Sequence, residues 1–214
     1  MLIEKSQYSK VLVDSLDILN ITKEQPFGYM EFGCGVGDTT ITASEVFRGY
    51  NTEYVAFDSF LGLPSSAEQE SNGLFKTGQF STTKDAFLQN LKSNAFPLER
   101  LTVFSGWFNE VLPLCLANKS VPEQDYRIFL FDCDLYSSTK SALEFLLEIV
   151  KNECIIVFDD WYSSCSKCKE SGQRNAFYEF LRKNVKTVFA EAIGEYEYYG
   201  TTAGKCYWLK KYDC

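Results

Sequence analysis

The chain has 214 residues, of which 45% are hydrophobic and 23% charged, which is ordinary globular usage and excludes a fibrous repeat or a disordered chain. Its net charge of -8 leaves no basic surplus to neutralise phosphates, which argues against a nucleic-acid partner. Because the sequence contains no histidine, Ser-His-Asp and Cys-His catalysis are excluded. A general base must be a carboxylate, a lysine, a tyrosine or a metal-bound group.

The N-terminus lacks the pattern of a signal peptide, and no segment approaches the roughly 18 apolar residues of a membrane span. We therefore expect a cytoplasmic protein. Four of its cysteines fall in apolar segments or in a glycine loop and are predicted to be reduced core residues: Cys34, Cys115, Cys133 and Cys154. Cys165 and Cys168 form a single C-x-x-C, and because a zinc site needs about four ligands and the chain has no histidine, a structural zinc is only the minority interpretation of this pair.

Residues 6–20 carry apolar side chains at helical spacing and predict an amphipathic helix. We expect the segment 1–25 to pack on the domain, cover the site or mediate dimerisation. After Pro26 and Gly28, a strand over 29–32 runs into Gly33, Gly35 and Gly37. A helix follows to about residue 47, which Asp38 or Thr39 could cap.

The rest of the chain alternates in the same way. Strands are predicted over 53–57, 101–104, 128–131 and 154–158, helices from Ser81 and over 109–116, 139–150 and the region of 177–181, and antiparallel strands after 185. This pattern predicts one α/β domain over 1–214 with a Rossmann-like, doubly wound, mostly parallel seven-stranded sheet and an antiparallel strand near the C-terminus. Ligands bind such sheets at the carboxyl ends of the strands.

Polar residues gather at five of these strand ends. They are Glu31 to Gly37, Asp58 with Ser59, Ser105 to Trp107, Asp132 with Asp134, and Asp159 with Asp160. The polar loop over 63–80 is long for a compact domain, as is typical of lids and binding segments. Asp58 lies about 20 residues beyond the glycines, where dinucleotide folds place the acid that binds ribose hydroxyls.

The glycine spacing selects among ligands. A nicotinamide or flavin fingerprint requires a third glycine at 38 or 40, which are Asp38 and Thr40, and the Gly-Lys-Ser/Thr ending of a P-loop is absent. The pattern Glu31-x-Gly33-x-Gly35-x-Gly37 instead resembles the first motif of class I S-adenosylmethionine-dependent methyltransferases. In that family the glycines wrap the amino-acid part of the cofactor, and the acid at the position of Asp58 binds its ribose.

Further motifs extend this resemblance to the macrocin O-methyltransferase family of sugar-modifying enzymes over about residues 29–182. They are the segments 57–64 and 78–81, Gly106-Trp107-Phe108 with Leu112-Pro113, the segment 132–139, and Phe158-Asp159-Asp160. The resemblance implies an O-methyltransferase that uses S-adenosylmethionine and Mg²⁺ or another divalent cation on a hydroxyl of a sugar or glycosylated metabolite.

The implied site residues follow from these motifs. Cofactor-binding residues would be Glu31, Gly33, Gly35, Gly37, Thr39, Asp58, Ser59, Ser105, Gly106, Trp107 and Asp132. The metal ligands would be Asp132, Asp159 and Asp160, and three carboxylates are the hard oxygen donors that Mg²⁺ prefers. The general base would be Asp132 or Asp134, although Asp134 could equally cap the following helix.

Two other functions stay open at this stage. Asp132-x-Asp134 could be the D-x-D of a metal-dependent glycosyltransferase, or the fold could bind its cofactor without turnover. The serine- and cysteine-rich loop over 162–171 departs from the family pattern and is expected to shape the acceptor pocket. Trp107, Trp161 and Tyr162 could stack on a sugar or belong to the core.

Overall fold

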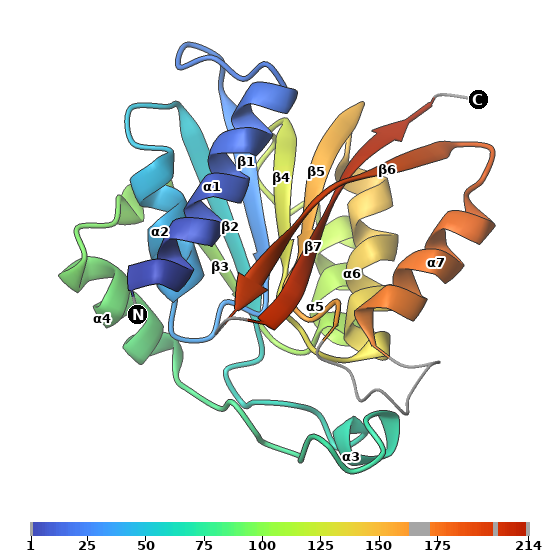
Figure 1. Ribbon diagram of the computed structural model, residues 1–214. Coiled ribbons are helices and arrows are strands. Elements are labelled where there is room, and N and C mark those ends of the chain that lie inside the picture. Colours follow the sequence, from blue (N-terminus) through green and yellow to red (C-terminus); the bar gives the residue numbers. More distant parts are fainter. Residues whose placement is uncertain (1, 163–171, 199–200, 213–214) are drawn as a thin grey trace.

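A seven-stranded sheet forms the centre of the computed structural model, which describes residues 2–162, 172–198 and 201–212 (Figure 1). The strand order is β3-β2-β1-β4-β5-β7-β6, and β1 to β5 pair in parallel while β7 runs antiparallel to both β5 and β6. The bounds are β1 (Phe27–Phe32), β2 (Thr52–Asp58), β3 (Leu101–Ser105), β4 (Tyr126–Phe131), β5 (Glu153–Phe158), β6 (Val188–Tyr198) and β7 (Thr201–Lys211). The predicted fold class is confirmed.

Helices cover both faces of the sheet, so the fold has three layers (Figure 1). The helices α1 (Leu2–Ile18), α2 (Asp38–Val46) and α4 (Lys84–Ser93) pack on one face, and α5 (Phe108–Ala117), α6 (Tyr136–Ile149) and α7 (Gln173–Lys183) pack on the other. Short helices occur at α3 (Ala67–Glu70) and η1 (Leu98–Arg100). Alternate side chains of a strand serve alternate layers: Tyr29 points to the first face, and Met30 and Phe32 point to the second.

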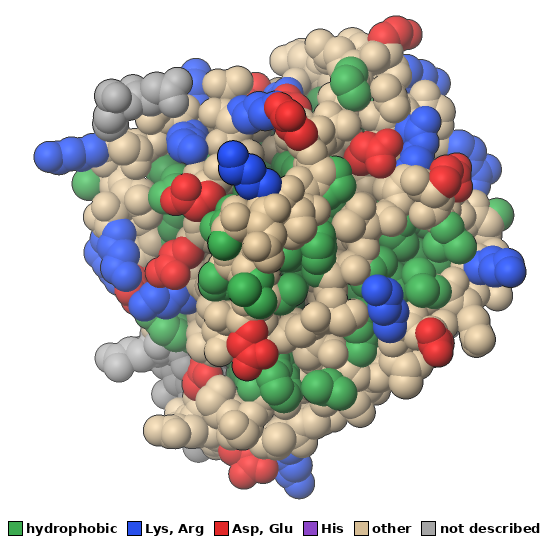
Figure 2. Space-filling view, turned by 180° about the vertical axis from the view of Figure 1, so that it is seen from behind, with side chains coloured by type: hydrophobic (Ala, Val, Ile, Leu, Met, Phe, Trp, Pro, Cys, Tyr) green, Lys and Arg blue, Asp and Glu red, His purple; other side chains and the backbone are tan. Residues whose placement is uncertain are grey.

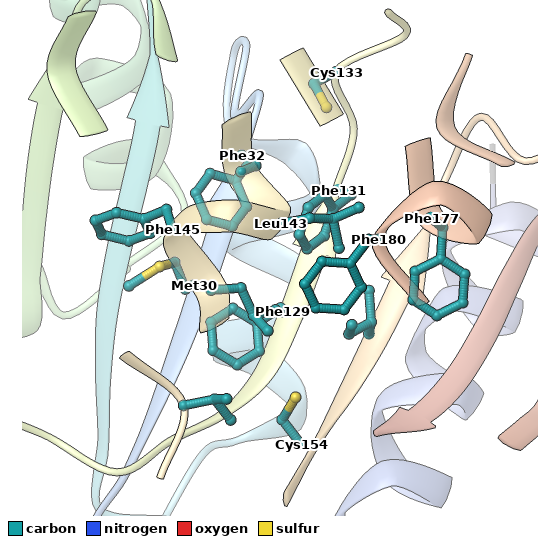
Figure 3. Close-up of a cluster of buried hydrophobic side chains, with 14 of the residues drawn as sticks. Met30, Phe32, Phe129, Phe131, Cys133, Leu143, Phe145, Cys154, Phe177 and Phe180 are labelled. Atoms are coloured by element: carbon teal, nitrogen blue, oxygen red, sulfur yellow. The ribbon is translucent and has the colours of Figure 1, made fainter. Parts of the chain in front are cut away.

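An aromatic cluster packs directly beneath the carboxyl ends of the central strands. The ring of Phe32 at the end of β1 lies 4.9 Å from that of Phe131 at the end of β4, and 5.4 Å from that of Phe57 on β2. Phe145 of α6 covers them from the helix layer (Figure 3). These fully buried rings hold the strand ends at fixed relative positions, which matters because the polar residues begin one residue later.

Some local predictions need correction. Gly37, with φ 92°, is the N-cap of α2 and makes no side-chain cap, so Asp38 and Thr39 do not cap the helix as predicted. The hydroxyl of Thr39 instead donates to Glu31. The helix expected from Ser81 begins at Lys84, because the Thr83 hydroxyl accepts a hydrogen bond from the backbone N–H of Ala86 at 3.0 Å.

The N-terminal helix belongs to the core of this chain. Leu12 of α1 is fully buried, and Tyr8, Leu16 and Leu19 are nearly so, all in the cluster shared with α2 and β1. Two apolar residues of α1, Val13 and Ile18, are exposed. The use of 1–25 as a lid or dimer interface stays a prediction.

The cysteines that lie in apolar segments are part of the core. The four cysteines expected in the core, Cys34, Cys115, Cys133 and Cys154, are all free and buried, which confirms that prediction. Cys165 and Cys168 lie outside the described residues.

Within the described ranges no helix is both long and apolar enough to cross a membrane. On the face seen in Figure 2, acidic and basic side chains are intermingled, so neither sign of charge is concentrated there.

Candidate functional site

The backbone ladder of the parallel sheet continues one residue beyond the strands and aligns the loops that follow them. Gly33 N–H donates to the Phe57 carbonyl at 2.8 Å, Asp132 N–H to the Phe32 carbonyl at 2.9 Å, and Asp159 N–H to the Phe131 carbonyl at 2.9 Å. The strand order reverses between β1 and β4, so the glycine loop and Asp132 meet at the switch point, where doubly wound folds bind ligands.

A cavity of about 660 Å³ opens at this edge of the sheet. It brings together twelve of the residues predicted for the site: Gly33, Gly35, Gly37, Thr39, Asp58, Ser59, Gly106, Trp107, Asp132, Asp134, Asp159 and Asp160. Glu31 and Ser105, also predicted to bind the cofactor, do not line it. The carboxyl ends of five strands therefore do converge, as the sequence predicted.

The three glycines are needed for three different reasons. A Cβ on Gly33 would lie 1.7 Å from the carbonyl oxygen of Asp132, so this position packs against the next strand. A Cβ on Gly37 would lie 2.3 Å from the side chain of Leu91, so this position packs against α4. Around Gly35, whose φ is +48°, no described atom lies within 4 Å of an added Cβ, and the backbone there faces open space in the cavity.

Asp58 is held beside this open space. Its Oδ2 accepts a hydrogen bond from Gly35 N–H at 2.8 Å, and its Oδ1 accepts one from Phe60 N–H at 2.7 Å. Each carboxylate oxygen can accept a second bond, so the group can receive a pair of hydroxyl donors from a ligand without losing its backbone contacts.

Glu31 lies in the protein interior and does not line the cavity. Its side chain is fully buried and accepts hydrogen bonds from the hydroxyls of Thr39, Thr40 at 2.8 Å and Tyr29 at 3.0 Å. The Tyr29 hydroxyl in turn lies 2.9 Å from that of Tyr8 on α1. Burial raises the pKa of Glu31 to about 7, and the three hydroxyl donors oppose that rise. Glu31 therefore ties the start of α2 to β1.

Three carboxylates meet on the far side of the cavity. One oxygen each from Asp132, Asp159 and Asp160 lies within 4.8 Å of the others. Asp134 lines the same cavity, and its backbone N–H donates to Oδ2 of Asp160 at 2.9 Å. Asp134 has φ 54°, and the N-cap of α6 is Leu135, so Asp134 is not the helix cap that the sequence left open.

Burial, and after it the charges of neighbouring acids, raise the pKa values of Asp132 and Asp134. Burial raises the pKa of Asp132 well above its ordinary value, and the charges of Asp159, Asp160 and Asp134 raise it further. Burial and then the charge of Asp159 raise the pKa of Asp134 to about 7. A divalent cation would relieve this repulsion, and the all-carboxylate donor set fits Mg²⁺.

Residues from both ends of the predicted lid loop also line the cavity, among them Leu63 and Phe80. The ends are joined, because Leu63 N–H donates to the Gln79 carbonyl at 2.9 Å and Gly78 N–H donates to the Leu63 carbonyl at 2.8 Å. Between them, Glu70 accepts hydrogen bonds from the hydroxyl and N–H of Ser137 on α6. The loop is thus docked against the domain.

The predicted aromatic residues have different surroundings. Trp161 is buried against Phe158 and Phe177 and belongs to the core, whereas Tyr162 is 39% exposed at the start of the acceptor-side loop. Residues 163–171 of that loop lie outside the described residues. The buried indole Nε1 of Trp107 has no hydrogen-bond partner among the described residues, so an unused donor lies in the cavity wall.

Comparisons with known proteins gave one family match and several fold matches. Residues 20–191 match the sequence model of the family described as Macrocin-O-methyltransferase (TylF). A search of the curated proteins found no significant match.

Solved structures show the same fold. The calicheamicin methyltransferase CalS11 has 20% identity and a TM-score of 0.69, with 96% of this chain and 77% of CalS11 covered. The O-methyltransferase NovP has 18% identity and a TM-score of 0.67, with coverages of 97% and 79%. The cofactor-bound protein Rv0187 from MTB has 16% identity and a TM-score of 0.60, with coverages of 95% and 79%.

Proposed function

Because this chain belongs to the macrocin O-methyltransferase (TylF) family, an S-adenosylmethionine-dependent family of sugar O-methyltransferases, we propose that it methylates a hydroxyl of a sugar or glycosylated metabolite with the help of a divalent cation. The observation that carries the proposal is the pairing, in one cavity, of an open glycine loop with a cluster of three carboxylates. The glycine loop suits the methyl donor, and the carboxylate cluster suits a cation and the acceptor hydroxyl.

The donor half of the site would be formed by the loops after β1, β2 and β3. Gly35 leaves space for a ligand against the backbone, and Asp58 offers acceptors for the two ribose hydroxyls. Thr39 and Ser59, with Gly106 and Trp107 after β3, would contact the rest of the cofactor. When bound, S-adenosylmethionine would supply the methyl group on a sulfonium sulfur, and the cation would lower the pKa of the acceptor hydroxyl.

The acceptor half would be formed by the acids. Asp159 and Asp160 would hold the cation with Asp132. Asp132 would also take the proton of the acceptor hydroxyl as the oxygen forms its bond to the methyl carbon, while the carbon–sulfur bond breaks and its electron pair stays on sulfur. Asp134 is the second candidate for this base, because it lines the same cavity. The main contribution of the protein would be to align oxygen, carbon and sulfur.

The family match favours methyl transfer over the D-x-D glycosyltransferase, and so does the acid cluster. In the described structure the three grouped carboxylates include both residues after β5 but not Asp134, the second acid of the D-x-D. A sugar acceptor is implied by the resemblance to the macrocin O-methyltransferase family. It is also supported by the similarity to the solved structure of apo CalS11, which is described as a TDP-rhamnose 3'-O-methyltransferase.

Calorimetry with the full chain tests the donor site directly. We expect S-adenosylmethionine and S-adenosylhomocysteine to bind, and a nucleotide sugar to bind more weakly. Absence of binding by both cofactor forms would contradict the proposal. Methylation of sugar and glycoside acceptors with labelled cofactor, with and without EDTA, separates the two parts of the proposal: activity unaffected by EDTA would remove the cation from it.

A further inference from the structure

Both acids that follow β5 are held by buried side chains from later parts of the chain. We propose that Tyr196 of β6 and Gln173 of α7 are positioning residues that orient Asp159 and Asp160 as cation ligands. The inference deepens the proposed function and rests on it for the role of the acids. The hydrogen bonds that carry it are present in the structure independently of any ligand.

Tyr196 reaches Asp159 from the edge strand β6, which is separated from β5 by β7. Its hydroxyl donates to Oδ1 of Asp159 at 2.5 Å, and its ring is buried, with 4% of its surface exposed. Gly204 on the neighbouring strand β7 pairs with Tyr196, and a Cβ there would lie 1.9 Å from the tyrosine ring. The glycine therefore provides the space in which the ring lies, and on another side the ring meets that of Tyr8 at 6.4 Å.

Gln173 holds Asp160 at its backbone. Its amide oxygen accepts a hydrogen bond from Asp160 N–H at 2.9 Å, while its Nε2 donates to the Phe131 carbonyl at 2.9 Å. Nε2 also lies 3.4 Å from Oδ2 of Asp160. The orientation of the amide follows from its partners, because one is a donor and the others are acceptors. Gln173 is fully buried, and it joins the ends of β4 and β5.

Orientation matters at this site because the acids repel one another. Without donors, three carboxylates within 4.8 Å would rotate apart, and a cation would have to reassemble them at a cost in affinity. The Tyr196 hydroxyl forms a hydrogen bond with one oxygen of Asp159 and so fixes the direction of the other oxygen. In the same way, the Gln173 amide fixes the position of the Asp160 backbone. Outer contacts of this kind tune metal affinity by about 10- to 100-fold in known sites.

The first experiment replaces Tyr196→Phe in the full chain, which keeps the ring and removes only the hydroxyl. We expect Mn²⁺, titrated by electron paramagnetic resonance, to bind about 10-fold more weakly or worse than to the wild type. Tyr126→Phe is the matched control, since the Tyr126 hydroxyl donates to the Pro122 carbonyl at the opposite edge of the sheet. The Tyr126→Phe control should lose about as much free energy of unfolding as Tyr196→Phe does, but it should bind Mn²⁺ with the affinity of the wild type. Equal affinity in Tyr196→Phe and wild type would overturn the role of Tyr196.

Gln173→Met tests the second residue, because methionine has a similar shape but cannot form these hydrogen bonds. We expect a loss of Mn²⁺ affinity comparable to that of Tyr196→Phe, and wild-type affinity would overturn the role of Gln173.

Crystal structures of both variants give a readout that needs no cation. The Asp159 carboxylate should rotate in the first variant and the Asp160 segment should shift in the second, whereas unchanged acids would overturn the proposal. A wild-type protein that binds no Mn²⁺ would contradict the metal part of the proposed function, and the crystal structures would still decide whether these residues position the acids.

Discussion

Gly33 and Asp132 pack against each other at the switch point of the sheet, where a Cβ on Gly33 would lie 1.7 Å from the Asp132 carbonyl oxygen. The first glycine of the proposed cofactor loop and the proposed base therefore have a fixed separation. A change at Gly33 has to move one of two strand ends, whereas a change at Gly35 meets only the cavity.

Gly33→Ala and Gly35→Ala should consequently fail in different ways. We expect Gly33→Ala to lower the free energy of unfolding by about 3 kcal/mol or more, because the clash is with backbone. Gly35→Ala should cost only about 1–2 kcal/mol for its left-handed backbone, yet weaken cofactor binding at least about 10-fold by filling the ligand space. Urea denaturation and calorimetry separate the two effects, and equal stability of the two variants would contradict this account.

Asp58→Asn should weaken binding of S-adenosylhomocysteine by about 2 kcal/mol, because it replaces a charged acceptor of two hydroxyl donors. Calorimetry measures the loss. Glu53→Gln, at the other end of the same strand β2, is the matched control and should bind as the wild type does. If both variants bound equally well, Asp58 would have no role in holding the ribose.

Asp160→Asn should raise the Mg²⁺ concentration required for half-maximal methylation at least about 10-fold, since one of three charged ligands is lost. The control is Asp125→Asn, an acid that lies just before β4 and pairs with Arg127 at the opposite edge of the sheet. A Mg²⁺ dependence identical to that of the wild type would show that Asp160 does not hold the cation.

Stability should depend on pH through Glu31. Burial raises the pKa of Glu31 to about 7 from 4.5, so between these values the folded protein retains a proton that the unfolded chain has released. The free energy of unfolding contributed by this group should therefore fall as pH rises from about 4.5 to 7, by about 3 kcal/mol in total. Glu31→Gln cannot titrate, so urea denaturation at pH 5 and pH 8 should show a smaller difference for the variant. Equal differences would contradict the assignment.

The N-terminal helix offers two neighbouring residues with opposite exposure. Leu12 is fully buried and Val13 is 46% exposed. We expect Leu12→Ala to lower the free energy of unfolding by about 2–5 kcal/mol and Val13→Ala by no more than about 0.5 kcal/mol. A small effect of Leu12→Ala would mean that α1 is not part of the folded core and would strengthen its use as a lid.

Much of the fold could be predicted because it depends on local patterns. The apolar runs ending at Phe32, Phe131 and Phe158 are strands that are buried on both faces, and their ends matched the structure. Helix starts were less accurate at α2, α4 and α6, where α6 begins at Tyr136 instead of about residue 139, and at α2 and α4 the capping residue was not the predicted one. Asp38, for instance, accepts a hydrogen bond from Asn90 of α4 instead of capping its own helix.

The sequence by itself determined the alternating α/β order, the three closely spaced glycines, and the acids at strand ends, because strand periodicity and the parallel sheet place such residues on one edge. The tertiary structure alone decided how they work together. It turned Glu31 inward to three hydroxyls, left Gly35 open while enclosing Gly33, and brought Tyr196 to Asp159 from 37 residues away. These contacts depend on how helices and strands pack across the sheet, which no local pattern encodes.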